Sequence, residues 1–153
     1  MNTPYFQILL KENRLPTPHW DNEAENFISP IQIASTTRFG TIVIPKGFEW
    51  DGMSWLKKIW GKQGWPSAWH DFIYRMQPEG WTQEMADLVF FDLMVEAGIS
   101  KTVARVRYLG LRLGGWYAWW RNKKRYAEDR ERFRREGLQA FVKNCERYEK
   151  GIV

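Results

Sequence analysis

The sequence of 153 residues has few of the residues that build disulfides, metal clusters or membrane spans. Its single cysteine, Cys145, excludes an internal disulfide and any metal site made of several cysteines. The longest stretch without Asp, Glu, Lys or Arg is residues 26–37, which is too short for a transmembrane helix and includes a proline. The first residues lack a basic segment followed by a long apolar one, so we expect no signal peptide and synthesis in the cytoplasm.

Tryptophan and basic residues, by contrast, are abundant and unevenly placed. The chain holds ten tryptophans, and its apolar fraction of 44% and charged fraction of 27% are typical of one globular domain. Residues 1–100 carry a net charge of −4, whereas residues 101–153 carry +9. A basic C-terminal region on an acidic body indicates an anionic partner. Because six acids are interleaved with its fifteen bases, a solvated helix with surface salt bridges explains the same charges.

The first fifty residues have the pattern of β-strands. Residues 5–10 form a short apolar run, and β-branched residues within 31–33 and 41–44 flank a turn at residues 38–40. Pro30 fits only the start of a strand or an edge strand. We therefore expect a small antiparallel sheet of two to four strands.

The rest of the sequence has helical periodicity. A first helix is expected from Pro66 to Met76, a second opens at Thr82 and runs to about Ala97, and a third is capped by Ser100. On the third helix, apolar residues recur every three or four positions and are expected to face the core. These residues are Val103, Val106, Leu109, Leu113, Trp116 and Trp120.

Together these patterns predict an α+β fold, in which a small N-terminal antiparallel sheet packs on a bundle of three to five helices. We expect residues 1–115 to form one domain and residues 116–153 to form a basic, aromatic helical tail. Gly110, Gly114 and Gly115 either weaken the middle of the third helix or allow another element to approach it closely.

A histidine and an aspartate lie on the apolar sides of the first two helices. At 100° per residue, His70 and Asp87 each fall among apolar neighbours on their own helix. The short turn between these helices makes them antiparallel neighbours, and an unpaired buried carboxylate is costly, so we predict a hydrogen bond between the two side chains. In such a pair the carboxylate fixes the imidazole tautomer, and the other ring nitrogen is left to act as a base.

The same residues also have a structural interpretation, in which the His70–Asp87 pair only locks two helices together. Tyr74, one turn after His70, either donates to Asp87 or is a core aromatic residue. Asp71 is either part of a surface salt bridge or, with Asp51, an oxygen ligand of a hard cation. Because these ligands are carboxylates and the only cysteine is distant, the candidate cofactor is calcium rather than zinc.

Four short motifs follow one another along the middle of the chain. They are P-x-G-F at residues 45–48, D-G-x-S at 51–54, H-D-x-x-Y at 70–74 and A-D at 86–87. Their order resembles an uncharacterised family of small phage and prophage proteins, and the resemblance covers roughly residues 41–115. It implies a phage-encoded protein that is made in the host cytoplasm and that in one interpretation is associated with the virion.

The pair of helices is also similar to the catalytic core of phospholipase A2 enzymes, including the form embedded in parvovirus capsids. By that resemblance His70 would activate water and Asp71 would hold calcium. Tyr74 and Asp87 would support the histidine, and the loop around Asp51 would lie near the site.

Aromatic residues stand directly before a cluster of bases in the C-terminal part of the third helix. We expect Tyr117 and Trp119 to point outward and to form an interaction surface with these bases, which are Arg121, Lys123, Lys124 and Arg125. Such residues suit an anionic membrane surface, single-stranded nucleic acid or a protein partner. We place another phage protein first and nucleic acid last, because no nucleic-acid-binding module is recognisable. Nothing in the sequence sets the oligomeric state.

Three functions remain open on the sequence alone. The first is a phage-encoded hydrolase similar to phospholipase A2, with His70 as base, Asp87 as its orienting partner and Asp71 as calcium ligand. The second is a non-enzymatic virion protein of the tail or capsid, in which the His–Asp pair is structural. The third is an accessory protein that binds nucleic acid through the basic tail.

Overall fold

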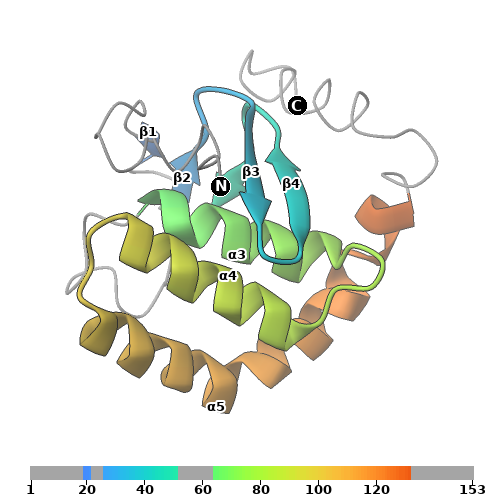
Figure 1. Ribbon diagram of the computed structural model, residues 1–153. Coiled ribbons are helices and arrows are strands. Elements are labelled where there is room, and N and C mark those ends of the chain that lie inside the picture. The colour runs from blue at the N-terminus through green and yellow to red at the C-terminus, as the bar shows by residue number, and fades with distance from the viewer. Residues whose placement is uncertain (1–18, 22–25, 52–63, 132–153) are drawn as a thin grey trace.

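The computed structural model describes residues 19–21, 26–51 and 64–131, which form five short strands followed by three helices (Figure 1). The strands are β1 (His19–Asp21), β2 (Asn26–Ile28), β3 (Ile33–Thr37), β4 (Gly40–Ile44) and β5 (Glu49–Trp50). The helices are α3 (Gly64–Met76), α4 (Gln83–Glu96) and α5 (Lys101–Arg125). Strands that precede helices, with antiparallel pairing throughout, confirm the predicted α+β fold.

The strands form two antiparallel sheets rather than the single sheet that was expected. The first sheet has the order β1-β2-β5, and Phe27 of β2 pairs with Trp20 on one side and Trp50 on the other. Each strand of this sheet has only two or three residues, so period-two alternation could not reveal it. The strand predicted at residues 5–10 lies outside the described residues.

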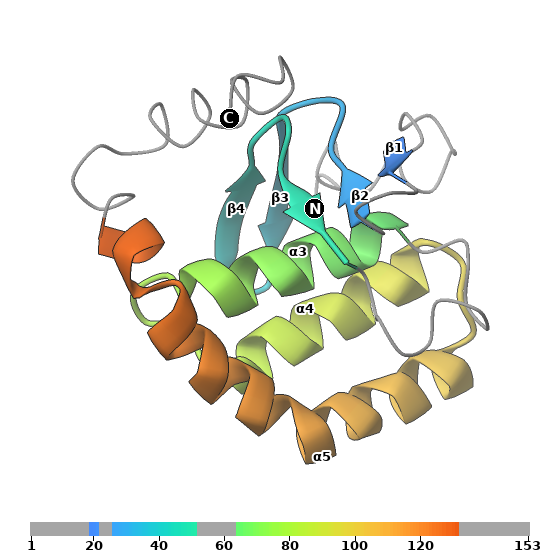
Figure 2. The same cartoon turned by 180° about the vertical axis from the view of Figure 1, so that it is seen from behind.

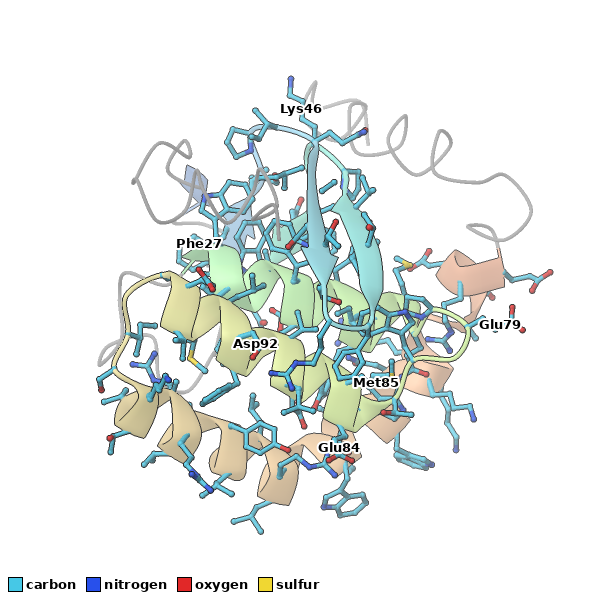
Figure 3. The ribbon with its side chains drawn as sticks, viewed as in Figure 1. Phe27, Lys46, Glu79, Glu84, Met85 and Asp92 are labelled. Atoms are coloured by element: carbon cyan, nitrogen blue, oxygen red, sulfur yellow. The ribbon has the colours of Figure 1, made fainter. Side chains whose placement is uncertain are left out.

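The second sheet is the hairpin of β3 and β4, which confirms the turn predicted at residues 38–40. Ile33 pairs with Ile44 at the open end, and these two side chains are buried against the helices. At the tip, Arg38 donates two hydrogen bonds of 2.7 and 2.5 Å to Asp92 of α4, which Figure 3 labels. The hairpin is therefore anchored to α4 as well as to the core.

The helix boundaries follow the capping residues found in the sequence. Thr82 and Ser100 are the N-caps of α4 and α5, and each hydroxyl accepts a bond from the backbone N–H three residues later. Helix α3 begins at Gly64, two residues before the expected start, and ends at Met76 as predicted. Gln77 follows in a left-handed conformation with φ of 40°, which stops the helix and turns the chain toward α4.

The hydrophobic core lies between the strands and α3 and is rich in tryptophan. Trp50 and Trp69 are fully buried, and each indole N–H has an acceptor. Trp50 donates to Ser67 Oγ at 3.1 Å, and Trp69 donates to the carbonyl of Ile42 at 3.3 Å. These bonds join strand residues to α3 and offset the cost of burying polar indole groups.

Helix α5 packs on α4 and α3, and both views of the ribbon show that it is bent (Figures 1 and 2). Its first part lies along α4 on the side away from the strands, and its C-terminal part turns past the end of α3. The apolar stripe that was expected to face the core is on its outer side, so this prediction is wrong. Leu113 is 81% exposed, and Val103, Val106, Leu109, Trp116 and Trp120 are also exposed. The inner side instead holds the buried Ala104, Arg107 and Gly115, with Leu111, Ala118 and Trp119 packed against the core. Gly115, which lacks a side chain, allows α5 to approach its neighbours closely.

Trp119 also differs from its prediction, whereas Tyr117 is exposed as expected. The Trp119 ring is partly buried and meets the edge of Tyr74 at a centroid distance of 5.2 Å. The domain boundary placed between residues 115 and 116 lies inside the continuous helix α5. Among the described residues, no helix is both long and apolar enough to cross a membrane.

Candidate functional site

Asp87 of α4 is the centre of a buried hydrogen-bond network that draws on three helices. Its side chain has no exposed surface. Oδ1 lies 3.0 Å from His70 Nε2 and accepts a 2.7 Å bond from the Tyr74 hydroxyl. Oδ2 accepts a bond of 3.4 Å from Gln83 Nε2 and one of 3.2 Å from Arg112 Nη1. Hydrogen bonds from four groups offset much of the cost of burying this carboxyl group.

Helical spacing explains how His70 and Tyr74 reach the same carboxylate. They are four residues apart on α3, which places them on one face, and their ring centroids are 4.1 Å apart. The turn after α3 returns the chain so that α4 runs antiparallel beside it (Figure 1). Asp87 of α4 thereby contacts both side chains. The hydrogen bond predicted between His70 and Asp87 is confirmed. Of the two roles left open for Tyr74, the structure shows the first, because its hydroxyl donates a hydrogen bond to Asp87.

Sequence reasoning missed Arg112, which reaches the network from α5. The error follows from the predicted orientation of α5. With Leu113 facing the core, the neighbouring Arg112 would point too far from Asp87 to contact it. Gly115, one turn further along, is the residue that could have signalled the true inner face. A Cβ there would clash with the Tyr74 hydroxyl and lie 2.7 Å from Gln83 Nε2, so any larger residue would displace these two donors.

His70 has a carboxylate at each ring nitrogen. Nε2 faces Asp87, and Nδ1 lies 3.3 Å from Asp71 Oδ1. Burial by itself lowers the pKa of His70, but the hydrogen bonds and charges of Asp71 and Asp87 outweigh it and raise the pKa to about 9. At neutral pH the imidazole is therefore protonated and donates to both carboxylates.

Tyr74 supplies a neutral donor to the same network. Burial, followed by the charge of Asp87, raises the pKa of its hydroxyl far above the ordinary value. The phenol is therefore protonated at neutral pH. Its hydrogen bond to Oδ1 helps to position the Asp87 side chain without adding a charge to the site.

Asp71 has one oxygen that the network does not satisfy. Its Oδ2 is buried, and no hydrogen-bond partner for it exists in the described part of the chain. A buried acceptor without a donor is a position that a hard cation would satisfy, so Asp71 fits the predicted role of calcium ligand.

The second predicted ligand, Asp51, lies directly after β5 and is partly exposed, and residues 52–54 of its motif are outside the described residues. Within residues 19–21, 26–51 and 64–131, no three His, Cys, Asp or Glu side chains gather into a metal site. A complete ligand set therefore stays a prediction.

The predicted basic cluster lies at the end of α5, away from Asp87. All four of its bases are exposed: Arg121, Lys123, Lys124 and Arg125. Lys124 Nζ lies 4.4 Å from the centre of the Trp120 ring, and the Arg121 guanidinium lies 6.0 Å from that of Tyr117. Arg121, Lys124 and Tyr117 therefore share an exposed surface with Trp120, whereas Trp119 belongs to the inner side.

Comparison with known proteins gives a family and no function. Residues 27–111 match the DUF1353 family, which is described as a protein family of unknown function. The match covers more than half of the chain and includes His70, Tyr74 and Asp87, whereas Arg112 lies one residue beyond it. No curated protein and no solved structure matches the chain.

Proposed function

Because the chain belongs to the DUF1353 family, whose function is unknown, we propose its activity from the site: a phage-encoded hydrolase similar to phospholipase A2. The observation that carries the proposal is the buried His70–Asp87–Tyr74 network. Asp87 holds Nε2 from within the core, so Nδ1 is the nitrogen directed toward the partly exposed Asp71. The order of the four sequence motifs supports a phage origin.

In this proposal His70 is the general base, with Nδ1 as the reacting atom. Nδ1 takes a proton from water, and the water oxygen bonds to the carbonyl carbon of a glycerophospholipid ester. The carbon–oxygen bond of the ester then breaks, and the alcohol leaves with the proton that His70 returns. Asp87 and Tyr74 do not touch the substrate; they hold the ring and stabilise its positive charge.

The proposal requires Asp71 to be drawn away from Nδ1, since a protonated imidazole cannot act as a base. Asp71, with its unsatisfied Oδ2, is the residue that would hold calcium, and Asp51 is the second candidate ligand. Bound calcium would supply a Lewis acid that polarises the ester carbonyl. An Asp71 engaged in this way no longer stabilises the imidazolium, so the pKa of His70 would fall toward its ordinary value.

A second candidate function follows from the occupancy of both His70 nitrogens. His70 is 7% exposed and bridges two carboxylates, and Arg112 contacts Asp87 from α5. Such an arrangement also suits a non-enzymatic virion protein in which the network fastens three helices together.

The experiment that separates the two functions is a lipid hydrolysis assay on the full chain. Release of fatty acid from phosphatidylglycerol vesicles is measured with calcium, with zinc and with a chelator, for the wild type and for His70→Gln. The glutamine amide can still donate to Asp87 but cannot take a proton from water. The hydrolase predicts calcium-dependent release that falls at least about 100-fold in the variant.

The matched control is Asp92→Asn, which removes a carboxylate from α4 outside the network. It should keep full activity. His70 is buried, so its replacement lowers stability in either case, and all assays are run well below the melting temperature of the weaker variant. A wild type that releases no fatty acid with any metal would favour the virion protein instead.

A further inference from the structure

The outer face of α5 is a continuous apolar surface. Its members are all exposed: Val106, Leu109, Leu113, Trp116, Tyr117 and Trp120. At 100° per residue they occupy an arc of about 100° on the helix, opposite Ala104 and Gly115 on the inner side. Exposed apolar residues that are contiguous, rather than scattered, mark an interaction surface.

The charges of α5 are of one sign. The helix contains eight bases and no acid. Arg107 is buried and Arg112 contacts Asp87, which leaves six exposed bases. These are Lys101, Arg105, Arg121, Lys123, Lys124 and Arg125.

The exposed bases border the apolar face. By the same helical spacing, Arg105 and Lys123 lie at different heights along α5 but on the angular edge of the face that Trp116 marks. Arg121 lies beside Tyr117 at the opposite edge. The side chain of Lys124 lies over the Trp120 ring. Positive charge therefore lies at both edges of the apolar face and, at Lys124, among its aromatic residues.

We propose that the outer face of α5 docks the protein on an anionic lipid surface. The aliphatic and aromatic side chains enter the boundary between headgroups and acyl chains, and the flanking bases contact lipid phosphates. The first part of α5 lies along α4 on the side away from the strands, and its C-terminal part turns past the end of α3 (Figures 1 and 2). The side chains of this face are exposed along both parts.

The composition of the face favours lipid over the other anionic or apolar partners. Val106, Leu109 and Leu113 cannot stack on nucleobases, whereas aromatic stacking is the main contact of proteins with single strands. A second copy would bring six exposed bases against six others, which like-charge repulsion opposes. The sequence-based prediction placed a phage protein ahead of a membrane, because of the family resemblance and the acids interleaved with the bases. On α5 itself there is no acid. The six-residue apolar face reverses that order.

The docking proposal does not rest on the hydrolase, although α5 also supplies Arg112 to the site. Binding is therefore measured with a chelator present, so that hydrolysis does not enter the result. The full chain is floated on vesicles of phosphatidylglycerol mixed with phosphatidylcholine and, separately, on pure phosphatidylcholine. We expect strong binding to the first, little to the second, and a steep loss as salt rises.

Point variants then test the face itself. Leu113→Gln should weaken vesicle binding at least about tenfold, because the bilayer interface no longer buries a leucine side chain at this position. Arg105→Gln and Lys123→Gln should each weaken it about fivefold. The control is Lys46→Gln, since Figure 3 shows Lys46 at the end of the molecule away from α5, and it should bind like the wild type.

Folding and competing partners are checked in the same series. Leu113 is 81% exposed, so Leu113→Gln should melt with the wild type, and Val106→Gln provides a second variant if it does not. Unchanged vesicle binding by the folded variant would overturn the proposal. So would a wild type that ignores vesicles but binds a single-stranded oligonucleotide, or one that forms a dimer that Leu113→Gln dissociates.

Discussion

Gly115 of α5 packs directly against the Tyr74 hydroxyl, which is the donor of the shortest bond to Asp87. A Cβ at this position would also lie 2.7 Å from Gln83 Nε2. Gly110 and Gly114, by contrast, have no neighbouring atom within 4 Å of such a Cβ. Of the two roles that the sequence left open for these glycines, close approach therefore applies to Gly115 alone.

This contact predicts opposite effects for two neighbouring glycines. Gly115→Ala should lower the free energy of unfolding by about 1–3 kcal/mol, because the methyl group displaces Tyr74 and Gln83 from Asp87. Gly114→Ala, in open space on the same helix, should raise it by up to about 1 kcal/mol through helix propensity. Urea unfolding of both variants measures the difference, and equal effects would contradict the close approach.

The charge of Asp87 should matter more than that of any exposed carboxylate. Asp87→Asn leaves His70 and Arg112 without their shared anion in a buried site, and we expect a loss of about 3–5 kcal/mol in unfolding free energy. Asp92→Asn breaks the ion pair with Arg38, whose side chain is 50% exposed, and should cost no more than about 1 kcal/mol. Comparable losses in the two variants would show that the network is not centred on Asp87.

The pair at the centre of the site could be predicted from the sequence because both residues break a local rule. A histidine and an aspartate on apolar helix faces must find partners, and the short turn between α3 and α4 offers each of them the other. The hairpin turn and the N-caps Thr82 and Ser100 could also be predicted, because each depends on residues close to it in the sequence.

The orientation of α5 could not be predicted in the same way. Periodicity locates an apolar face on a helix but does not say whether that face meets the core or another surface. On α5 the inner face is set by how closely Gly115 and Ala104 approach α3 and α4, which is a tertiary contact. Arg112 was missed for the same reason, because its partner lies on a helix 25 residues away in sequence.

The corrected orientation of α5 predicts different roles for two adjacent tryptophans. Trp119→Ala should lower the free energy of unfolding by on the order of 2 kcal/mol, because its ring packs against Tyr74 on the inner side. Trp120→Ala should change it by less than about 0.5 kcal/mol, since Trp120 is 49% exposed on the outer side. Thermal or urea unfolding checks both, and the reverse order would restore the sequence-based orientation.

The raised pKa of His70 predicts how stability depends on pH. Its pKa in the folded protein, about 9, is higher than the ordinary 6.5, because Asp71 and Asp87 hold the proton more strongly than water does. The stabilisation is fully present below pH 6.5 and is lost as pH rises through about 9. This difference in pKa corresponds to on the order of 3 kcal/mol.

Urea unfolding at a series of pH values between 6 and 10 measures this loss in the wild type. His70→Gln removes the titrating group, so the free energy of unfolding should be nearly independent of pH between 6.5 and about 9. Asp92→Asn, outside the network, should keep the slope of the wild type. A wild type whose stability is constant between pH 6.5 and 9, and falls only as pH drops below about 6.5, would mean that His70 is neutral in the folded protein. Nδ1 would then be free to accept a proton without any change at Asp71.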